Sequence, residues 1–325
     1  MQKRPLGTTG LTAPGLGCMG MSEFYGPTED TASLATLGAA LDIGYDFLDT
    51  ADTYGLGHNE ELLGRFLEDR RDRVVLATKF GIVRDARGSR RIDNTPAYIE
   101  AACNASLKRL RIETIDLYYC HRRNPETPLE ETMGAMAKLV DSGKVRALGL
   151  SEVSPATLRA AHAIHPIAAV QSEYSLWSRA PEDGMLETCD ELGVTFVAYS
   201  PLGRGFLTGA IDPKALSEGD FRKGNPRFQG EALTRNQRLA DALGAFAAAR
   251  GATAAQIALA WLVNKAPRVV PIPGARRATR LAENAAAVDL VLSSDEIAEL
   301  DALFSNDAVA GARYAAGGTA GIEVL

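Results

Sequence analysis

Short apolar runs alternate along the chain with longer segments in which apolar residues recur at helical spacing. Thr95–Pro96 and Ser154–Pro155 each place a capping residue before a first-turn proline, which predicts a helix start. Because each apolar run precedes a helical segment, the pattern predicts a parallel α/β fold. The strand-like runs lie at 47–50, 74–80, 116–121, 147–151, 168–172, 195–200 and 269–274, and GLGCMG at 15–20 supplies the eighth.

Eight strands interleaved with helices in 325 residues favour a (β/α)8 TIM barrel over an open doubly wound sheet. Because no linker rich in Pro, Gly or Ser divides the chain, we expect residues 1–325 to form a single barrel domain. The segment 205–237 is too long and polar for an ordinary connection and is predicted to be a loop that covers the mouth of the active site. The tail 305–325, rich in Ala and Gly, is predicted to be irregular.

Charge and composition argue against several function classes. The net charge is −6, and no long basic run favours nucleic acid or anionic lipid. No stretch approaches the roughly 20 apolar residues of a membrane span, and the N-terminus lacks the apolar core of a signal peptide. The four cysteines and four histidines show no metal-ligand spacing, so no metal is expected. We therefore expect a cytoplasmic protein with a small-molecule partner, in an oligomeric state that the sequence leaves open.

Four reactive side chains stand at the ends of three predicted strands. Asp49 ends the run FLD, Tyr54 follows five residues later, Lys79 comes after VVLAT, and His121 ends DLYYCH. Each has an ordinary structural explanation, as a cap, a packed ring, a rim charge or a solvated histidine. In a barrel, however, the carboxyl ends of the strands meet on one rim, where active sites lie. The joint occurrence of these four residues therefore predicts a catalytic site.

A set of motifs resembles the aldo-keto reductase superfamily over nearly the whole chain: LDTADTYG, ATKFG, YYCHR, GLSE, QSEYS, AYSPLGRG and IPGARRATRLAEN. The segment HPIAAVQSEYSLWSR resembles in particular the branch of perakine-reductase-like microbial and plant enzymes. This resemblance implies a (β/α)8 barrel that reduces aldehydes or ketones with NADPH, bound in an extended form without a GxGxxG loop. GLGCMGM at 15–21 is indeed not such a loop.

The resemblance also gives the four reactive residues their roles. Tyr54 would be the general acid that protonates the alkoxide, and Lys79 would lower the pKa of that phenol. Asp49 would hold Lys79 in place, and His121 would orient the substrate carbonyl.

The cofactor and substrate residues follow from the same resemblance. Ser151 and Gln171 would hold the nicotinamide carboxamide, and Tyr199 would stack on the ring. Glu152 stands where many relatives have Asn, and a carboxylate cannot donate as an amide does. The remaining residues expected at the cofactor are Gly20, Met21, Ser200, Leu202, Gly203, Arg204 and Gly205, together with Gly274, Arg276 and Arg280 for the 2′-phosphate and Glu283 and Asn284 for the adenine; the expected substrate pocket comprises Tyr25, Arg122, Arg123 and Trp177.

Two other functions are compatible with these residues. A lysine at a barrel strand end is also the nucleophile of Schiff-base lyases, which would give Lys79 a covalent role. A non-catalytic NADPH-binding regulatory subunit, similar to potassium-channel β subunits, would keep the same site.

Overall fold

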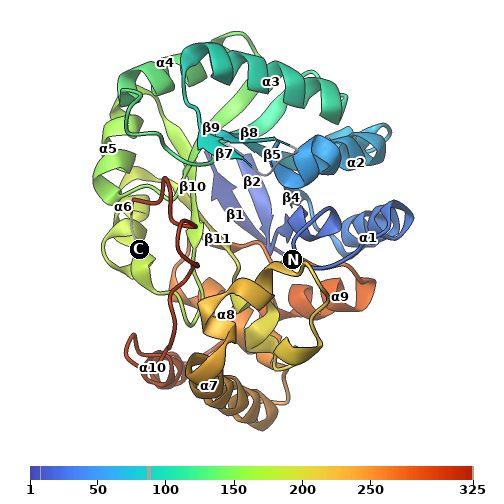
Figure 1. Cartoon of the computed structure of the whole chain (residues 1–325), viewed down its shortest axis with the longest axis vertical. Coiled ribbons are helices and arrows are strands. Elements are labelled where there is room, and N and C mark those ends of the chain that lie inside the picture. Colours follow the sequence, from blue (N-terminus) through green and yellow to red (C-terminus); the bar gives the residue numbers. More distant parts are fainter. Residues whose placement is uncertain (8, 86–88, 324–325) are drawn as a thin grey trace.

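Eight parallel strands form the central sheet in the computed structural model, which describes residues 1–7, 9–85 and 89–323 (Figure 1). Each of the eight predicted runs holds one strand, so the (β/α)8 prediction is confirmed. In the order of the sheet the strands are β12 (Val269–Pro271), β11 (Thr195–Tyr199), β10 (Ile167–Glu173), β9 (Val145–Ser151), β8 (Ile115–Cys120), β5 (Val75–Phe80), β4 (Phe47–Asp49) and β3 (Leu16–Gly17).

Contacts between the two outermost strands close the barrel. The amides of Gly15 and Gly17 donate to the carbonyls of Pro271 and Pro273, at N···O distances of 3.0 and 3.3 Å. A Cβ on Gly17 would lie 2.9 Å from the carbonyl oxygen of Ile272. A glycine is therefore required here, because only a residue without a side chain allows the two backbones to approach so closely.

A helix follows each strand of the sheet, and the helices cover its outside (Figure 1). Ser154 caps its helix as predicted, since its hydroxyl accepts a hydrogen bond from the Thr157 amide at 3.2 Å. Gly44 ends another helix in the left-handed conformation, with φ of 106°. The helices are α1 (Asp30–Ile43), α2 (His58–Leu67), α3 (Pro96–Leu110), α4 (Leu129–Asp141), α5 (Pro155–Ile164), α6 (Met185–Leu192), α8 (Ala254–Lys265) and α9 (Ala278–Ala286), with α7 (Gly230–Ala249) and α10 (Ser294–Leu303) in addition.

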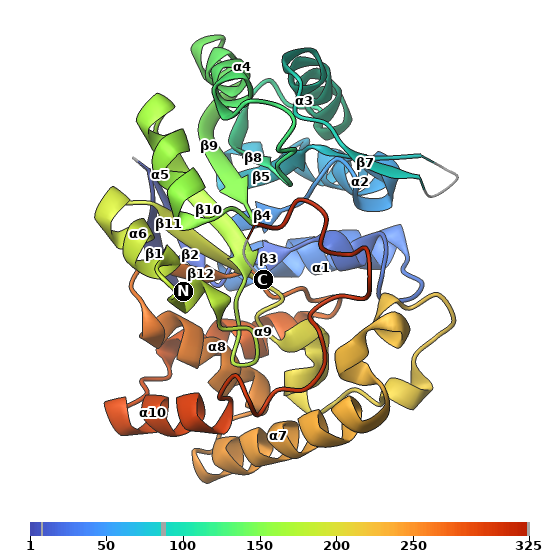
Figure 2. The same cartoon turned by 60° about the vertical axis from the view of Figure 1, so that its left-hand side comes forward.

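Two antiparallel hairpins were not predicted. The first, β1 (Gln2–Leu6) with β2 (Thr9–Ala13), packs Leu6 and Leu11 against side chains of the barrel interior such as Phe47 and Val197. This hairpin therefore closes the amino end of the barrel, and the opposite end holds the strand termini that carry the reactive residues. The second, β6 (Ile82–Arg84) with β7 (Arg90–Ile92), extends from the carboxyl end of β5 (Figure 2).

The segment predicted as a loop over 205–237 is irregular only in part. Short 3-10 turns extend to Phe228, but helix α7 begins at Gly230, so the predicted end of the loop is wrong. The helix forms because Asn236, Ala240 and Leu243 recur on one buried face. Beyond α10, residues 305–323 contain turns without a helix or strand, and this tail crosses the carboxyl ends of the sheet strands (Figure 2).

Within the described ranges no single helix is both long and apolar enough to cross a membrane. Helices α7 and α8 reach that length and composition only together, across a bend of 86°. The four cysteines are free thiols, and all of them are buried.

Candidate active site

Lys79 lies at the centre of the predicted catalytic group. Its side chain is fully buried, and its Nζ donates to Asp49 Oδ1 at 2.5 Å and to the carbonyl of Thr50 at 2.7 Å. The same ammonium lies 3.4 Å from the hydroxyl of Tyr54. Strands β4 and β5 pair with Asp49 opposite Ala77. Asp49 and Lys79 therefore enter the barrel near its carboxyl end from neighbouring strands.

Burial and neighbouring charges shift the pKa values of Lys79 and Tyr54 in opposite directions. Burial by itself would lower the pKa of Lys79, but Asp49 and Tyr54 outweigh it and raise that pKa, so the amine stays an ammonium. Burial raises the pKa of Tyr54 above its ordinary value, and the charge of Lys79 opposes this only in part. Lys79 therefore acts on the phenol pKa in the expected direction, but burial is the larger effect and the pKa is raised overall. At neutral pH the phenol keeps the proton that a general acid must donate.

His121 follows β8 and faces Tyr54, with the ring centroids 5.8 Å apart and the planes at 85°. Burial lowers the pKa of His121 well below its ordinary value, and the cations Arg122, Lys79 and Arg90 lower it further. The imidazole is therefore neutral at pH 7. Its buried Nδ1 has no hydrogen-bond partner in the part of the chain that the structure describes. Because His121 lines the cavity, its neutral ring can donate a hydrogen bond to a carbonyl oxygen there.

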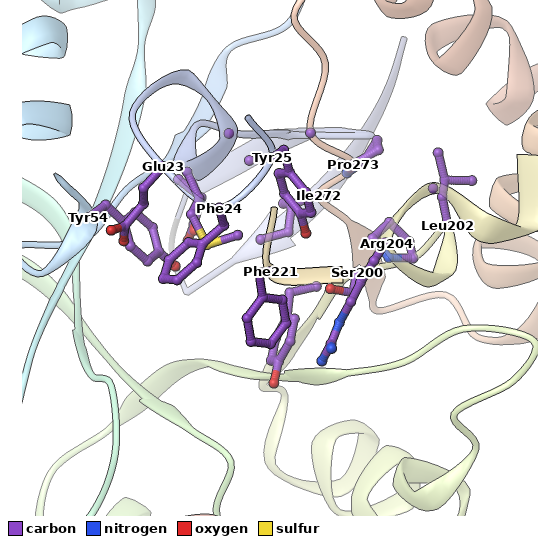
Figure 3. A pocket seen from close by; sticks show the side chains of 18 of the residues that line it. Glu23, Phe24, Tyr25, Tyr54, Ser200, Leu202, Arg204, Phe221, Ile272 and Pro273 are labelled. Atoms are coloured by element: carbon purple, nitrogen blue, oxygen red, sulfur yellow. The ribbon is translucent and has the colours of Figure 1, made fainter. Parts of the chain in front are cut away.

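Asp49, Tyr54 and His121 line a cavity of about 540 Å³ at the carboxyl end of the barrel (Figure 3). Tyr54 lines one side of it with Phe24, and Ser200 and Arg204 line another. Most residues expected at the cofactor also line this cavity: Gly20, Met21, Ser151, Gln171, Tyr199, Ser200, Leu202, Arg204, Gly205, Gly274, Arg276, Arg280, Glu283 and Asn284. Of the expected substrate residues, Tyr25 and Arg122 line it.

The cavity extends to a basic wall at the start of α9. Arg276 is exposed there and donates to the carbonyls of Pro27 and Tyr25, at 3.0 and 2.9 Å. Arg280 pairs with Glu283 at 2.5 Å. A cavity lined by a proton donor and by several guanidinium groups suits a ligand that carries phosphate.

Two expected site residues point elsewhere. Glu152 has a left-handed backbone, with φ of 59°, and its carboxylate accepts from the Glu173 amide at 3.0 Å and from Arg313 of the tail. It therefore holds the tail and does not line the cavity. Arg123 likewise faces the tail, where its Nε lies 3.1 Å from a carboxylate oxygen of Glu323.

Trp177 and Gly203 also lie outside the cavity wall in the described ranges. The indole of Trp177 is buried and stacks on Phe206, with centroids 5.1 Å apart and planes at 21°. Gly203 has φ of 56°, and a Cβ there would lie 2.6 Å from Trp177. Both residues therefore belong to the buried packing around Phe206.

The tail supplies cavity residues that the sequence analysis missed. Tyr314 lines the cavity, and its hydroxyl lies 2.8 Å from that of Tyr199. Arg313 donates to the Tyr199 hydroxyl at 2.7 Å and to Glu173 at 2.9 Å. The only signal in the sequence is one Arg-Tyr pair within an Ala- and Gly-rich tail, and the pair does not reveal which distant residues it contacts.

Glu173 is the anchor of this tail contact. Its carboxylate is 2% exposed and also accepts from Arg204 Nη2 at 3.2 Å, while Arg227 Nη1 lies 3.7 Å away. Burial alone would raise the pKa of Glu173, but Arg313, Arg204 and Arg227 lower it to about 2. The carboxylate therefore stays ionised and holds the tail across the ends of the strands.

The chain is similar to known proteins over nearly its whole length. Residues 15–304 match the model of the aldo/keto reductase family. The aldo-keto reductase yakc [NADP(+)] of Schizosaccharomyces pombe is 44% identical over 321 residues, which cover 97% of this chain and 94% of that protein.

Solved structures agree with this assignment. A glycerol dehydrogenase from Gluconobacter oxydans superposes with a TM-score of 0.85 at 30% identity, covering 93% of this chain and 94% of that chain. An aldo/keto reductase from Klebsiella pneumoniae in complex with NADP and acetate gives a TM-score of 0.72 at 32% identity, with 93% and 94% covered. The fold, the buried group around Lys79 and these similarities lead to one conclusion: the chain belongs to the aldo/keto reductase family.

Proposed function

We propose that this protein reduces aldehydes or ketones to alcohols with NADPH. The observation that carries the proposal is the buried contact of Lys79 with Asp49 and Tyr54, beside a neutral His121 at the wall of the cavity. Reduction of a carbonyl needs a proton donor at the developing alkoxide, and this arrangement offers a protonated phenol there.

The residues of the chain fit the cofactor. Arg204 lines the cavity, and its buried Nη1 has no partner in the described part of the chain, so a donor is available for phosphate oxygens. Arg276 and Arg280 would meet the 2′-phosphate, and Ser151 and Gln171 would hold the carboxamide. When bound, NADPH supplies the hydride.

The protein's own side chains then direct the proton. His121 donates a hydrogen bond to the carbonyl oxygen and orients it towards Tyr54. Tyr54 gives its proton to that oxygen as the alkoxide forms. Lys79, held by Asp49, stabilises the resulting phenolate until solvent returns the proton.

Neither alternative function is favoured by this geometry. A Schiff-base lyase needs a neutral amine, but Lys79 is buried against a carboxylate and its pKa is raised. A cofactor-binding regulatory subunit would keep the same phenol, ammonium and imidazole, so turnover of a carbonyl substrate distinguishes it from the reductase. No contact among the described residues at the cavity favours either alternative over the reductase.

Replacing Tyr54 by Phe tests the proposal. Loss of the proton donor should lower carbonyl reduction by about 10²–10⁴-fold, while the NADPH dissociation constant from fluorescence titration changes little. Tyr98→Phe is the matched control, because it removes a hydroxyl that bonds Asp52 and does not line the cavity. Reduction by Tyr54→Phe at the wild-type rate would show that this phenol is not the acid.

Three narrower assignments belong to the same proposal. The segment HPIAAVQSEYSLWSR supports membership of the perakine-reductase-like branch. The four free, buried thiols support a cytoplasmic location. Phe221 lines the cavity, which supports a covering role for the irregular residues 205–229.

A further inference from the structure

The cavity wall beside His121 carries two guanidinium groups, Arg90 and Arg122. Both line the cavity, and both lower the pKa of His121 through their charge. The two arginines come from different elements. Arg90 is the first residue of β7 in the second hairpin, and Arg122 is the residue after His121, just beyond the end of β8. Two separate parts of the fold therefore bring positive charge to the place where a substrate carbonyl would bind.

Most other cations of the cavity wall have carboxylate partners. Four make ion pairs: Arg84 with Glu23, Arg204 with Glu173, Arg222 with Asp220 and Arg280 with Glu283. Arg276, at the start of α9, bonds backbone carbonyls. In contrast, neither Arg90 nor Arg122 makes an ion pair with a carboxylate in the described ranges. Glu152 attracts Arg122 at longer range, but it is itself bound by Arg313.

Arg122 is the more informative of the two residues. The residue is only 7% exposed, and its guanidinium makes hydrogen bonds through Nη1 alone, to the His121 carbonyl at 2.6 Å and to Ser151 Oγ at 3.1 Å. Its buried Nε has no partner among the described residues. Burying a cation is costly unless an anion compensates it, so the empty donor positions favour an anionic ligand.

The cavity wall also carries apolar side chains. Phe24, Ile82 and Phe221 line the same cavity as these arginines, and Ile82 lies in the same hairpin as Arg90. A ligand that fits both features has an apolar body with one anionic group. Carboxylate suits the planar fork of a guanidinium group.

We propose that the preferred substrates are aldehydes or ketones that carry a carboxylate, which Arg90 and Arg122 bind while the carbonyl faces Tyr54 and His121. This inference rests on the proposed reductase function and specifies its substrate class.

A pair of aldehydes that differ only in charge tests the inference. Purified protein with NADPH is assayed with para-formylbenzoate and with its methyl ester, and the meta isomers are assayed in the same way. The carboxylate should be preferred in kcat/KM by about tenfold or more, as expected for charge-assisted hydrogen bonds to a buried guanidinium group. Added salt should reduce this preference, since it screens the charge of the arginine at the rim.

Variants assign the preference to the two arginines. Arg90→Gln should lower the ratio of acid to ester by about fivefold, because Arg90 lies at the exposed rim, where an ion pair is weaker. Arg91→Gln is the matched control, because the neighbouring Arg91 pairs with Asp93 and does not line the cavity. Arg122→Gln should bring the ratio close to one, even if both rates fall.

A binding experiment separates this inference from the reductase proposal. With NADP⁺ saturating, calorimetry should show benzoate binding more tightly than benzamide, and Arg90→Gln should weaken only benzoate. If neither aldehyde is reduced but this binding difference is found, the reductase proposal fails and the anion site stands. If the ester is reduced as well as the acid, or if Arg90→Gln and Arg91→Gln act alike on both substrates, the carboxylate inference is wrong.

Discussion

The ion pairs of Glu173 make the docking of the tail depend on pH. The carboxylate holds Arg313 of the tail against Arg204 and Arg227, and these cations lower its pKa to about 2 from an ordinary value of 4.5. The perturbation that we consider is Glu173→Gln, which keeps the shape of the side chain and removes its charge. Three guanidinium groups then lose one shared partner.

The lowered pKa of Glu173 sets the size of its contribution to stability and how that contribution changes with pH. A carboxyl group with a lowered pKa stabilises the folded state above its unfolded pKa of about 4.5, and this stabilisation is lost as the pH falls towards 2. A difference of about 2.5 pKa units at roughly 1.4 kcal/mol per unit corresponds to about 3 kcal/mol at pH 7. By pH 3 less than about half of this contribution remains.

Urea unfolding of the wild type and of Glu173→Gln at pH 7 and at pH 3 measures this contribution. The difference in the free energy of unfolding between the two proteins should be large at pH 7 and clearly smaller at pH 3. Glu187→Gln is the control, since its exposed carboxylate makes no ion pair in the described part of the chain. A difference that is equal at both pH values would refute the argument that Arg313, Arg204 and Arg227 hold Glu173 ionised.

Three further outcomes are expected. Arg276→Ala should weaken NADPH binding by about ten- to a hundredfold without an equal loss for NADH, and Arg277→Ala, which does not line the cavity, should change neither dissociation constant. Incubation with an aldehyde and borohydride should leave Lys79 without an adduct, because the amine stays protonated; a mass increase on Lys79 together with lost turnover would instead support the lyase. Gly17→Ala should lower the melting temperature, because its Cβ would meet the Ile272 carbonyl at 2.9 Å, and an unchanged melting temperature would show that β3 and β12 move apart easily.

The sequence by itself was enough to predict the barrel and the meeting of Asp49, Tyr54, Lys79 and His121 at its rim. Buried parallel strands appear as short apolar runs, and each of the eight runs became a strand. Asp49, Lys79 and His121 could be identified because they end such runs, and the carboxyl ends of barrel strands share one rim. The strands can be predicted from residues that are close together in the sequence. The meeting of the reactive residues then follows from the rule that the carboxyl ends of barrel strands share one rim.

Only the tertiary structure decided which residues from other parts of the chain join the strand ends at the cavity. Glu152 and Arg313 are 161 positions apart, and no local pattern indicates that they meet. Arg90 and Tyr314 reach the cavity from a hairpin and a tail that have no strong hydrophobic period. The pKa of Tyr54 also depends on burial, which only the packed barrel determines, and burial outweighs the charge of Lys79. Contacts between distant residues and the degree of desolvation are properties of the folded chain, so they could not be obtained from the order of its residues.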